Sequence, residues 1–350
     1  MTKPTQEFIE KVAKKNRFFG ATVEHVYWMK NILKAMQKTP LSHDFALMGG
    51  SAIAFLYENI YRLSIDLDLD YIANPDLGRE GSHEIEELQN KHFKFIQDIG
   101  DQLNLKVNQI ELTKDRRFAQ FQLTYPSVYG GTKSVDLDLG YRYCHSILEP
   151  NIIDFPDFID KDKIKVRTLA PEEIWASKII AAIGGNRMDV PEDNRGGKVF
   201  LGFKRKIRHL YDCYHLVKNI FEKQPNKIDF EILKKLVVLM GVTRIEEFEF
   251  FRGDMISLYS EKEIDEQLRP VIKTTKDTPD LLTMKRTFRK FLDQHVFAGY
   301  DENIYEFFED FSANIFRPQR LFEKNIANVL KKMFYYDEIL DKVIKKKEAL

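Results

Sequence analysis

The chain has 350 residues, of which 43% are hydrophobic and 31% are charged. This composition is that of a folded globular protein, and the length favours two domains over one. Its 54 basic residues balance 54 acidic residues, which excludes an overall charge that would attract nucleic acid or a membrane. Any such partner must be bound by a local patch.

Cysteine content and hydropathy indicate the compartment. Only Cys144 and Cys213 are present, far apart and without metal-ligand spacing, so a disulfide scaffold is excluded and a reducing environment is favoured. The first 20 residues are charged throughout, and no run approaches the ~18 apolar residues that a membrane-spanning helix needs. We expect a cytoplasmic protein without a membrane partner.

The first half of the chain alternates helices and strands. Apolar residues at helical spacing predict two helices between residues 6 and 37. Residues 44–50 predict a short strand ending in a glycine turn, followed by a helix over 51–63 with Ser51 near its N-cap and a strand over 64–72. A charged helix over 79–103 and paired strands over 116–128 and 133–144 follow.

The pattern changes after a segment rich in Pro and Asp at residues 149–163. Residues 170–183 predict a helix with Pro171 in its first turn, where proline is tolerated. From residue 222 onward almost every segment has helical periodicity. The sequence therefore predicts a mixed α and β first half and a mostly helical second half.

Three aspartates, Asp66, Asp68 and Asp70, alternate with apolar residues in the strand over 64–72. Alternate residues of a strand share one face at a spacing of ~6–7 Å, so these carboxylates repel one another. Magnesium removes that repulsion, since it binds one or two carboxylates together with substrate phosphates. The alternative is an edge strand that presents a polar face to water.

Two further features favour the metal site. Asp136 and Asp138 repeat the alternation in a second strand, and a Gly-Gly-Ser turn precedes the first strand by one helix. A glycine turn at a helix N-terminus exposes backbone N–H groups and a partial positive charge, which suits phosphate. A phosphate cradle, a carboxylate pair and a third carboxylate are the components of phosphoryl transfer.

These segments resemble a known family. "GGSAIAFL" and "YRLSIDLDLDY" resemble the signature of the AbiEii-type toxin nucleotidyltransferases, which belong to the DNA polymerase β-like nucleotidyltransferase superfamily. "VDLDLGYR", "VRTLAPEEIWASKIIAA" and "RHLYDCYHL" resemble later motifs of that family in the same order. The resemblance covers about residues 45–216. It implies an α+β fold, with a nucleotidyltransferase core of a small mixed sheet and flanking helices in residues 1–220 and a helical bundle in residues 221–350.

The resemblance also implies roles for individual residues. The nucleoside triphosphate would be bound by residues from four motifs: Gly49, Gly50, Ser51, Ser64, Lys178 and Asp212. Gly50 and Ser51 would hold its β- and γ-phosphates, and Lys178 would neutralise phosphate charge as pyrophosphate leaves.

The metal ligands implied by the resemblance are Asp66, Asp68 and Asp138. The metal would be Mg²⁺, with Mn²⁺ as the alternative. Asp138 would also help to activate the attacking hydroxyl, as a base or as a ligand. Asp136 is expected on the same face of the strand as Asp138, and it remains an alternative for the third carboxylate. Asp66, Asp68, Asp138 and Lys178 are thus the expected catalytic residues.

The implied function is magnesium-dependent transfer of a nucleoside monophosphate from an NTP to an acceptor hydroxyl, with release of pyrophosphate. The protein would be the toxin of a toxin–antitoxin or phage-defence pair. RNA is the leading acceptor class, with the 3′ end of tRNA first among its members. A cognate antitoxin is the expected protein partner.

Two departures from the family pattern keep alternatives open. His209 stands where the family has an aspartate, and the arginine that follows the motif lysine is displaced, with Arg187 the nearest candidate. The alternatives are a catalytically impaired NTP-binding interaction protein, a metal-dependent nuclease, and a nucleotidyltransferase acting on a protein or small molecule. A basic run over residues 195–208 is either a solvated face, in a mobile loop, or a contact for an RNA backbone.

Overall fold

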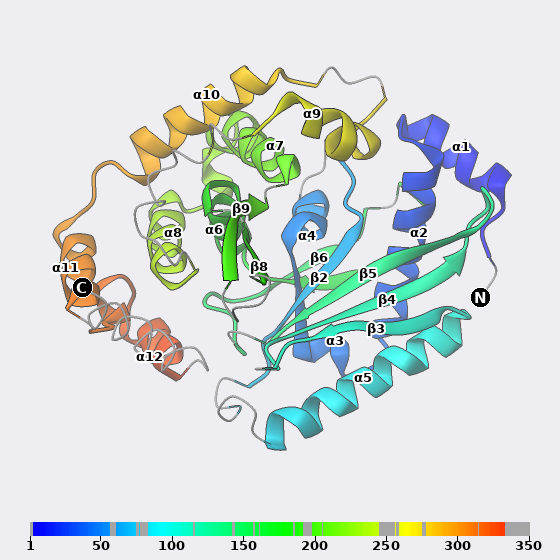
Figure 1. Cartoon of the computed structure of the whole chain (residues 1–350), viewed down its shortest axis with the longest axis horizontal. Coiled ribbons are helices and arrows are strands. Elements are labelled where there is room, and N and C mark those ends of the chain that lie inside the picture. The colour runs from blue at the N-terminus through cyan, green and yellow to red at the C-terminus, as the bar shows by residue number, and fades with distance from the viewer. Residues whose placement is uncertain are drawn as a thin grey trace.

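The computed structural model describes residues 3–56, 61–74, 77, 83–114, 116–141, 144–156, 158–160, 162–184, 186–191, 198–204, 206–244, 256, 259–274, 278–313 and 315–332. A twisted mixed sheet lies beside two long helices, and a group of helices from the second half of the chain lies against its other side (Figure 1). The expected α+β fold is confirmed.

Seven strands form the central sheet, in the order β3-β4-β5-β2-β1-β7-β6. They are β1 (Phe45–Met48), β2 (Asp66–Tyr71), β3 (Lys106–Leu112), β4 (Phe118–Pro126), β5 (Thr132–Gly140), β6 (Asn151–Asp154) and β7 (Lys165–Thr168). β2 is parallel to β5, and β1 is parallel to β7, whereas the other neighbours are antiparallel. The sheet is therefore mixed, as expected.

The helices of the first half are α1 (Gln6–Asn16), α2 (Gly20–Met36), α3 (Leu41–Asp44), α4 (Gly49–Leu56), α5 (His83–Leu103) and α6 (Pro171–Gly184). The side chain of Thr5 accepts a hydrogen bond from the backbone N–H of Phe8 and so caps α1. Pro171 begins α6 as predicted.

One face of the sheet is apolar and is covered by α2 and α5. Leu67 of β2 lies opposite Leu137 of β5, and both are buried. The ring of Phe93 from α5 meets Phe121 of β4 at 5.0 Å between centroids. Burial of these alternate side chains fixes the register, because a slip by one residue would turn them toward the opposite face.

The helix predicted over 51–63 is shorter in the structure. α4 ends at Leu56, and residues 61–65 are not helical. The backbone N–H of Leu63 donates to the carbonyl of Val271 at 2.8 Å, and Arg62 forms an isolated bridge with Ile272. Backbone partners far along the chain thus replace the helical hydrogen bonds.

Three strands of the central sheet were not predicted, namely β3, β6 and β7. β3 is an edge strand whose residues are mostly exposed, so it lacks apolar alternation. β6 and β7 have four residues each, which is too short for a period-two pattern to stand out.

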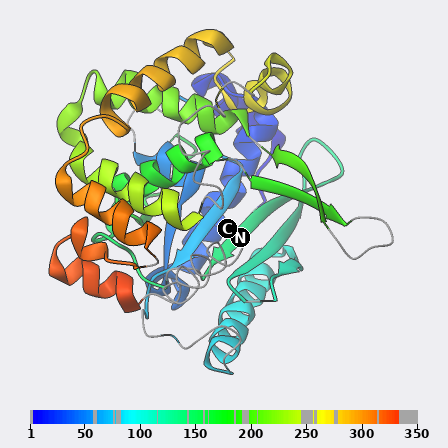
Figure 2. The same cartoon turned by 60° about the vertical axis from the view of Figure 1, so that its left-hand side comes forward.

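The basic run predicted as a mobile loop contributes instead to a hairpin. β8 (Asn186–Pro191) and β9 (Lys198–Lys204) pair as an antiparallel two-stranded sheet. The hairpin projects away from the rest of the protein (Figure 2). Arg187 lies on β8, whereas Arg195 and Arg205 lie outside the described residues.

From Ile207 onward every named element of the described residues is a helix. The α-helices are α7 (Ile207–His215), α8 (Phe230–Arg244), α9 (Glu261–Glu263), α10 (Leu281–Phe291), α11 (Glu302–Ser312) and α12 (Lys324–Lys332). Asp280 and Asp301 cap α10 and α11 through backbone N–H groups three residues on. The buried apolar residues form one cluster from Ile9 to Leu330. The domain boundary at residue 220 stays a prediction.

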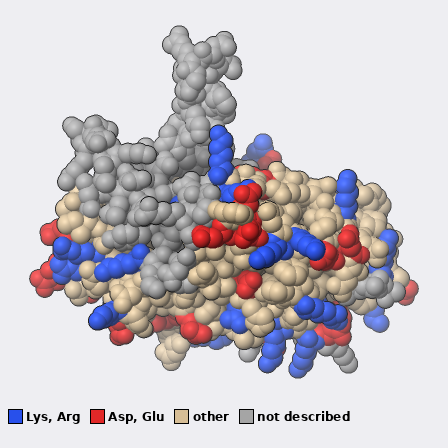
Figure 3. Space-filling view, turned by 90° about the horizontal axis from the view of Figure 1, so that it is seen from below, with Lys and Arg blue, Asp and Glu red and all other residues tan. Residues whose placement is uncertain are grey.

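The distribution of charged and apolar residues in the folded chain agrees with the balanced charge and the hydropathy of the sequence. Acidic and basic side chains are interspersed on the face shown in Figure 3, where a compact acidic group lies near the centre. Among the described residues, no helix has both the length and the apolar character needed to cross a membrane.

Candidate active site

The aspartates of β2 and β5 face one another across neighbouring strands. Asp66 is paired in register with Asp136, and Asp68 with Asp138. Because directly paired residues of parallel strands point to the same face, the four carboxylates lie together on the face opposite the buried leucines. The carboxylates expected to converge are therefore brought together.

Crowding of these carboxylates changes their acidity. Burial, followed by the charge of Asp66, raises the pKa of Asp68. Burial and the charges of Asp68, Asp66 and Asp136 raise the pKa of Asp138 to about 6, although Gln120 opposes this by donating a hydrogen bond to its Oδ1 at 2.8 Å. Oδ1 of Asp136 is buried without a hydrogen-bond partner in the described structure.

The glycine turn lies directly beside the aspartates. Gly49 has a φ of +66°, and a β-carbon there would overlap the carboxylate of Asp68. A β-carbon on Gly50 would come within 2.6 Å of Nη2 of Arg62 and 2.9 Å of Oγ of Ser64. Glycine is needed at both positions for the first turn of α4 to approach β2 this closely.

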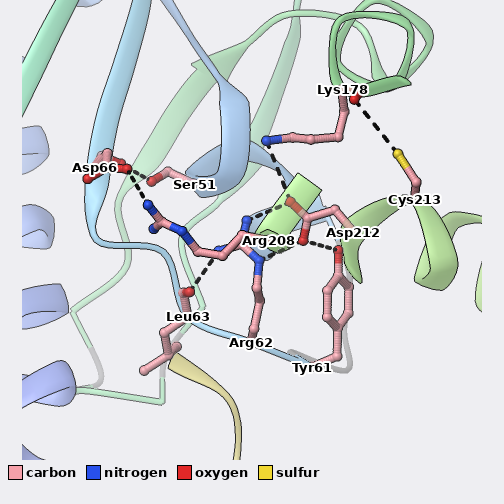
Figure 4. Close-up of polar contacts among 9 residues, drawn as sticks. All are labelled: Ser51, Tyr61, Arg62, Leu63, Asp66, Lys178, Arg208, Asp212 and Cys213. Carbon is pink, nitrogen blue, oxygen red and sulfur yellow. Dashed lines mark hydrogen bonds and ion pairs between the residues drawn. The ribbon is translucent and has the colours of Figure 1, made fainter. Parts of the chain in front are cut away.

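Ser51 occupies a different place from the one predicted. It is the third residue of α4 rather than a residue near the N-cap, and it is fully buried. Its hydroxyl donates a hydrogen bond to the backbone carbonyl of Asp66 (Figure 4). Ser51 thus joins α4 to the start of β2, and its contact with phosphate stays a prediction.

A buried ion network connects the second half of the chain to this site (Figure 4). Nε and Nη2 of Arg62 each donate to a different carboxylate oxygen of Asp212 at 2.6 Å. Nζ of Lys178, on α6, lies 3.5 Å from Oδ2 of Asp212. Burial alone would raise the pKa of Asp212, but Arg62 and Lys178 outweigh it and hold the pKa below its usual value.

Lys178 is predicted to contact phosphate, and that contact stays a prediction. Burial lowers the pKa of Lys178, and the charge of Arg62 adds to this effect, whereas Asp212 and Asp68 oppose it. Asp212 itself is fully buried and bonded to Arg62. The direct contact of Asp212 with a nucleotide stays a prediction.

A second cation lies over the aspartates. Nη2 of Arg208, in the first turn of α7, is 3.5 Å from Oδ2 of Asp66 (Figure 4). Arg208 belongs to the basic run whose function the sequence left open. In this structure its guanidinium partly balances the charge of the carboxylate pair.

A cavity of about 560 Å³ lies beside these groups, within the usual size range of small-molecule sites. Of the nine site residues predicted from the sequence, four line it, namely Gly49, Asp68, Asp138 and Lys178, and His209 lines it as well. The other five, Gly50, Ser51, Ser64, Asp66 and Asp212, are not among its lining residues.

His209 replaces the family's aspartate at the edge of this cavity. Burial, with the charges of Lys178 and Lys206 adding to it, lowers the pKa of His209 well below its usual value. Its imidazole is therefore neutral at physiological pH. Nδ1 of His209 is buried without a hydrogen-bond partner among the described residues.

The sequence model of the nucleotidyl transferase AbiEii toxin family, of type IV toxin–antitoxin systems, matches residues 31–311. The chain belongs to this family. It is accordingly a nucleotidyltransferase toxin, and membership of a toxin–antitoxin family implies an antitoxin partner. Comparison with curated proteins gives no significant match.

A solved structure is similar over almost the whole AbiEii-family chain. MenT4, a nucleotidyltransferase toxin from Mycobacterium tuberculosis H37Rv, superposes with a TM-score of 0.57 at 13% sequence identity. The match covers 93% of this chain and 98% of MenT4. At this identity the similarity establishes the shared fold.

The donor set of the AbiEii-family chain suits a hard divalent cation that also binds substrate. Among the described residues, no three His, Cys, Asp or Glu side chains form a ready-made metal cluster. Asp66 and Asp68 nevertheless provide oxygen ligands on one face, and the orphaned Oδ1 of Asp136 lies beside them. Two carboxylates completed by phosphate oxygens and water is the arrangement that magnesium commonly adopts.

Sequence analysis missed two residues that shape the site. Gln120 donates to Asp138, and the alternation of Gln120 and Gln122 in β4 was the available signal. Arg62 lies in the quoted signature, but its partner Asp212 is 150 positions away, so no local pattern could reveal the pairing. Arg142, in the "VDLDLGYR" motif, lies outside the described residues.

Proposed function

We propose that this toxin transfers a nucleoside monophosphate from an NTP to an acceptor hydroxyl, with Mg²⁺ bound at the paired carboxylates. The observation that carries the proposal is the register of β2 and β5, which sets Asp66 against Asp136 and Asp68 against Asp138 beside the glycine turn. Such crowding raises the energy of the empty site, and a divalent cation relieves it.

Asp66 and Asp68 would hold the metal, with Asp138 as the third ligand. Bound there, Mg²⁺ or Mn²⁺ would neutralise phosphate charge and orient the triphosphate. Gly49 and Gly50 would present the backbone N–H groups of the first turn of α4 to the phosphates. Ser64 lies against Gly50 and is the side-chain hydroxyl placed to assist.

The chain's own residues account for the movement of the proton and of the leaving group. The acceptor oxygen forms a bond to the α-phosphorus, and the bond from that phosphorus to the bridging oxygen of the β-phosphate breaks. The hydroxyl proton passes to Asp138, if this carboxylate acts as the base rather than as a metal ligand. Lys178 neutralises the charge of the departing pyrophosphate.

RNA is the proposed acceptor, with the 3′ end of tRNA as its leading form. The family resemblance implies this class, and two basic side chains support it. Lys206 lines the cavity, and Arg208, two residues later, lies 3.5 Å from Oδ2 of Asp66. Point charges beside a reacting centre are what an RNA backbone requires.

The test is incubation with each labelled NTP and total RNA in the presence of Mg²⁺, followed by a denaturing gel. We expect label on RNA of tRNA length, and no label after chelation of the metal or in Asp68→Asn. The matched control is Asp154→Asn, an exposed aspartate on β6, which should behave as wild type. Shortened RNA would indicate a nuclease, and label on protein a different acceptor. Nucleotide binding without any transfer would indicate an impaired interaction protein.

A further inference from the structure

A second feature of the sheet lies one row beyond the predicted metal ligands. Register pairs Phe118 of β4 with Gly140 of β5, and Gly140 with Asp70 of β2. These three residues share a face with Asp138 and Asp68, which are two positions earlier on their strands. All five line the same cavity. The row therefore continues the active-site surface with different chemistry.

Gly140 leaves the middle of this row without a side chain. A β-carbon there would overlap the carboxylate of Asp70. The φ of Gly140 is not positive, so its backbone conformation does not demand glycine. The absence of a side chain lets the carboxylate of Asp70 lie over Gly140, in the same row of the sheet as Phe118.

Phe118 has the surroundings of a binding residue rather than a core residue. It is half-buried, lines the cavity and is not part of the hydrophobic cluster. Its backbone is fixed by Thr113, whose hydroxyl accepts from the N–H of Phe118 at 3.1 Å and donates to its carbonyl at 3.3 Å. An aromatic ring held at a cavity in this way can stack on a flat ligand ring.

Charged groups surround the space beside that ring. Arg117, only 6% exposed, lines the cavity, and its carbonyl accepts a hydrogen bond from the N–H of Tyr141 at 2.8 Å. Asp70, whose carboxylate lies over Gly140, lines the same cavity and provides acceptor oxygens. An aromatic face combined with a donor and an acceptor at the edge is the chemistry that recognises a nucleobase.

The distance between this row and the row of Asp68 and Asp138 suits a nucleotide. Rows two residues apart along a strand are separated by ~6–7 Å, a separation that a ribose can span between its base and its phosphate or 3′ hydroxyl. A nucleotide with its reacting end at Asp68 and Asp138 would thus bring its base to the row that contains Phe118 and Asp70.

We propose that Phe118, Gly140, Asp70 and Arg117 form a nucleobase slot, in which the base stacks on Phe118. The proposal rests on the proposed function for the identity of the ligand. The base could come from the incoming NTP or from the terminal nucleotide of the acceptor. Both sources share the same ring chemistry, and the experiment separates them.

The test measures equilibrium binding with Mg²⁺ present and so does not depend on turnover. Four probes are compared: an NTP, inorganic tripolyphosphate, an RNA with an intact 3′-terminal nucleotide and the same RNA with an abasic terminus. Phe118→Ala should weaken either the NTP or the intact RNA by about 10- to 100-fold, the loss expected for one stacked base. Tripolyphosphate and the abasic RNA should be unaffected, and Phe118→Trp should bind as wild type.

Gly140→Val provides an independent check from a different strand, since its side chain would occupy the slot, and it should weaken the same probe. Tyr305→Ala, an exposed aromatic on α11, is the matched control and should change nothing. Affinities for all four probes that are unchanged in both Phe118→Ala and Gly140→Val would overturn the slot. Absence of label transfer by the wild type would instead refute the proposed function, and the binding comparison would still decide the slot.

Discussion

The two faces of the β2–β5 strand pair have opposite effects on the stability of the protein. On one face Leu67 and Leu137 are buried beneath α2 and α5, and each such side chain contributes about 1.5–3 kcal/mol to folding. On the other face burial, together with the charges of neighbouring carboxylates, raises the pKa values of Asp68 and Asp138. One strand pair therefore gains stability on the first face and loses some on the second, where the chemistry lies.

The largest expected difference between the faces is in activity. Asp66→Ala should lower nucleotide transfer by on the order of a thousand-fold, because loss of a metal ligand removes several kcal/mol of charge stabilisation. The melting temperature should stay the same or rise, since a crowded charge is removed. The ion pair lost with Arg208 is partly exposed and contributes little. Transfer at the wild-type rate would show that the metal site is wrongly assigned.

Removal of a leucine should have the reverse effect. Leu137→Ala should lower the free energy of unfolding by about 2–5 kcal/mol, as truncation of a fully buried leucine does. The affinity of the remaining folded protein for Mg-NTP should be unchanged. Urea denaturation and equilibrium binding measure the two quantities. Ile110→Ala, on exposed edge strand β3, is the control and should alter stability by less than about 0.5 kcal/mol. Equal losses in both variants would contradict the assignment of the core face.

This contrast between faces was largely visible in the sequence. Alternation of Asp66 and Asp68 with leucines, repeated at Asp136 and Asp138, predicts two strands with one acidic and one apolar face. The parallel pairing of those strands was not encoded locally. It depends on the crossover through α5, β3 and β4, which sets β5 beside β2.

Other parts of the site could not be predicted, for identifiable physical reasons. The pairing of Arg62 with Asp212 joins segments that only the folded chain brings together. The helix expected to continue past Leu56 ends there, and Leu63 forms its backbone hydrogen bond with Val271 instead. The β8–β9 hairpin was taken for a loop because its glycines and charges obscured the strand pattern.

The smallest expected effect is a pH dependence that belongs to the acidic face alone. The pKa of Asp138 is about 6 in the folded protein and 3.8 in the reference state, chiefly because of burial and neighbouring carboxylates. Between these values the folded protein holds a proton that the unfolded chain has released. The contribution of Asp138 to stability should therefore decrease as pH rises from about 4 to about 6 and stay lower above that range.

Asp138→Asn should abolish this decrease, because the amide does not titrate and its oxygen can still accept the hydrogen bond of Gln120. The difference in free energy of unfolding between the variant and the wild type should be roughly 1–2 kcal/mol more favourable to the variant at pH 7 than at pH 4. This amount allows for solvent screening, since Asp138 is partly exposed. Urea denaturation at several pH values between 4 and 7 measures the slope. Asp154→Asn should keep the wild-type slope. If the slope of Asp138→Asn equals that of the wild type, the pKa of Asp138 is not raised in the folded protein, and the two faces would then differ in chemistry but not in their effect on folding.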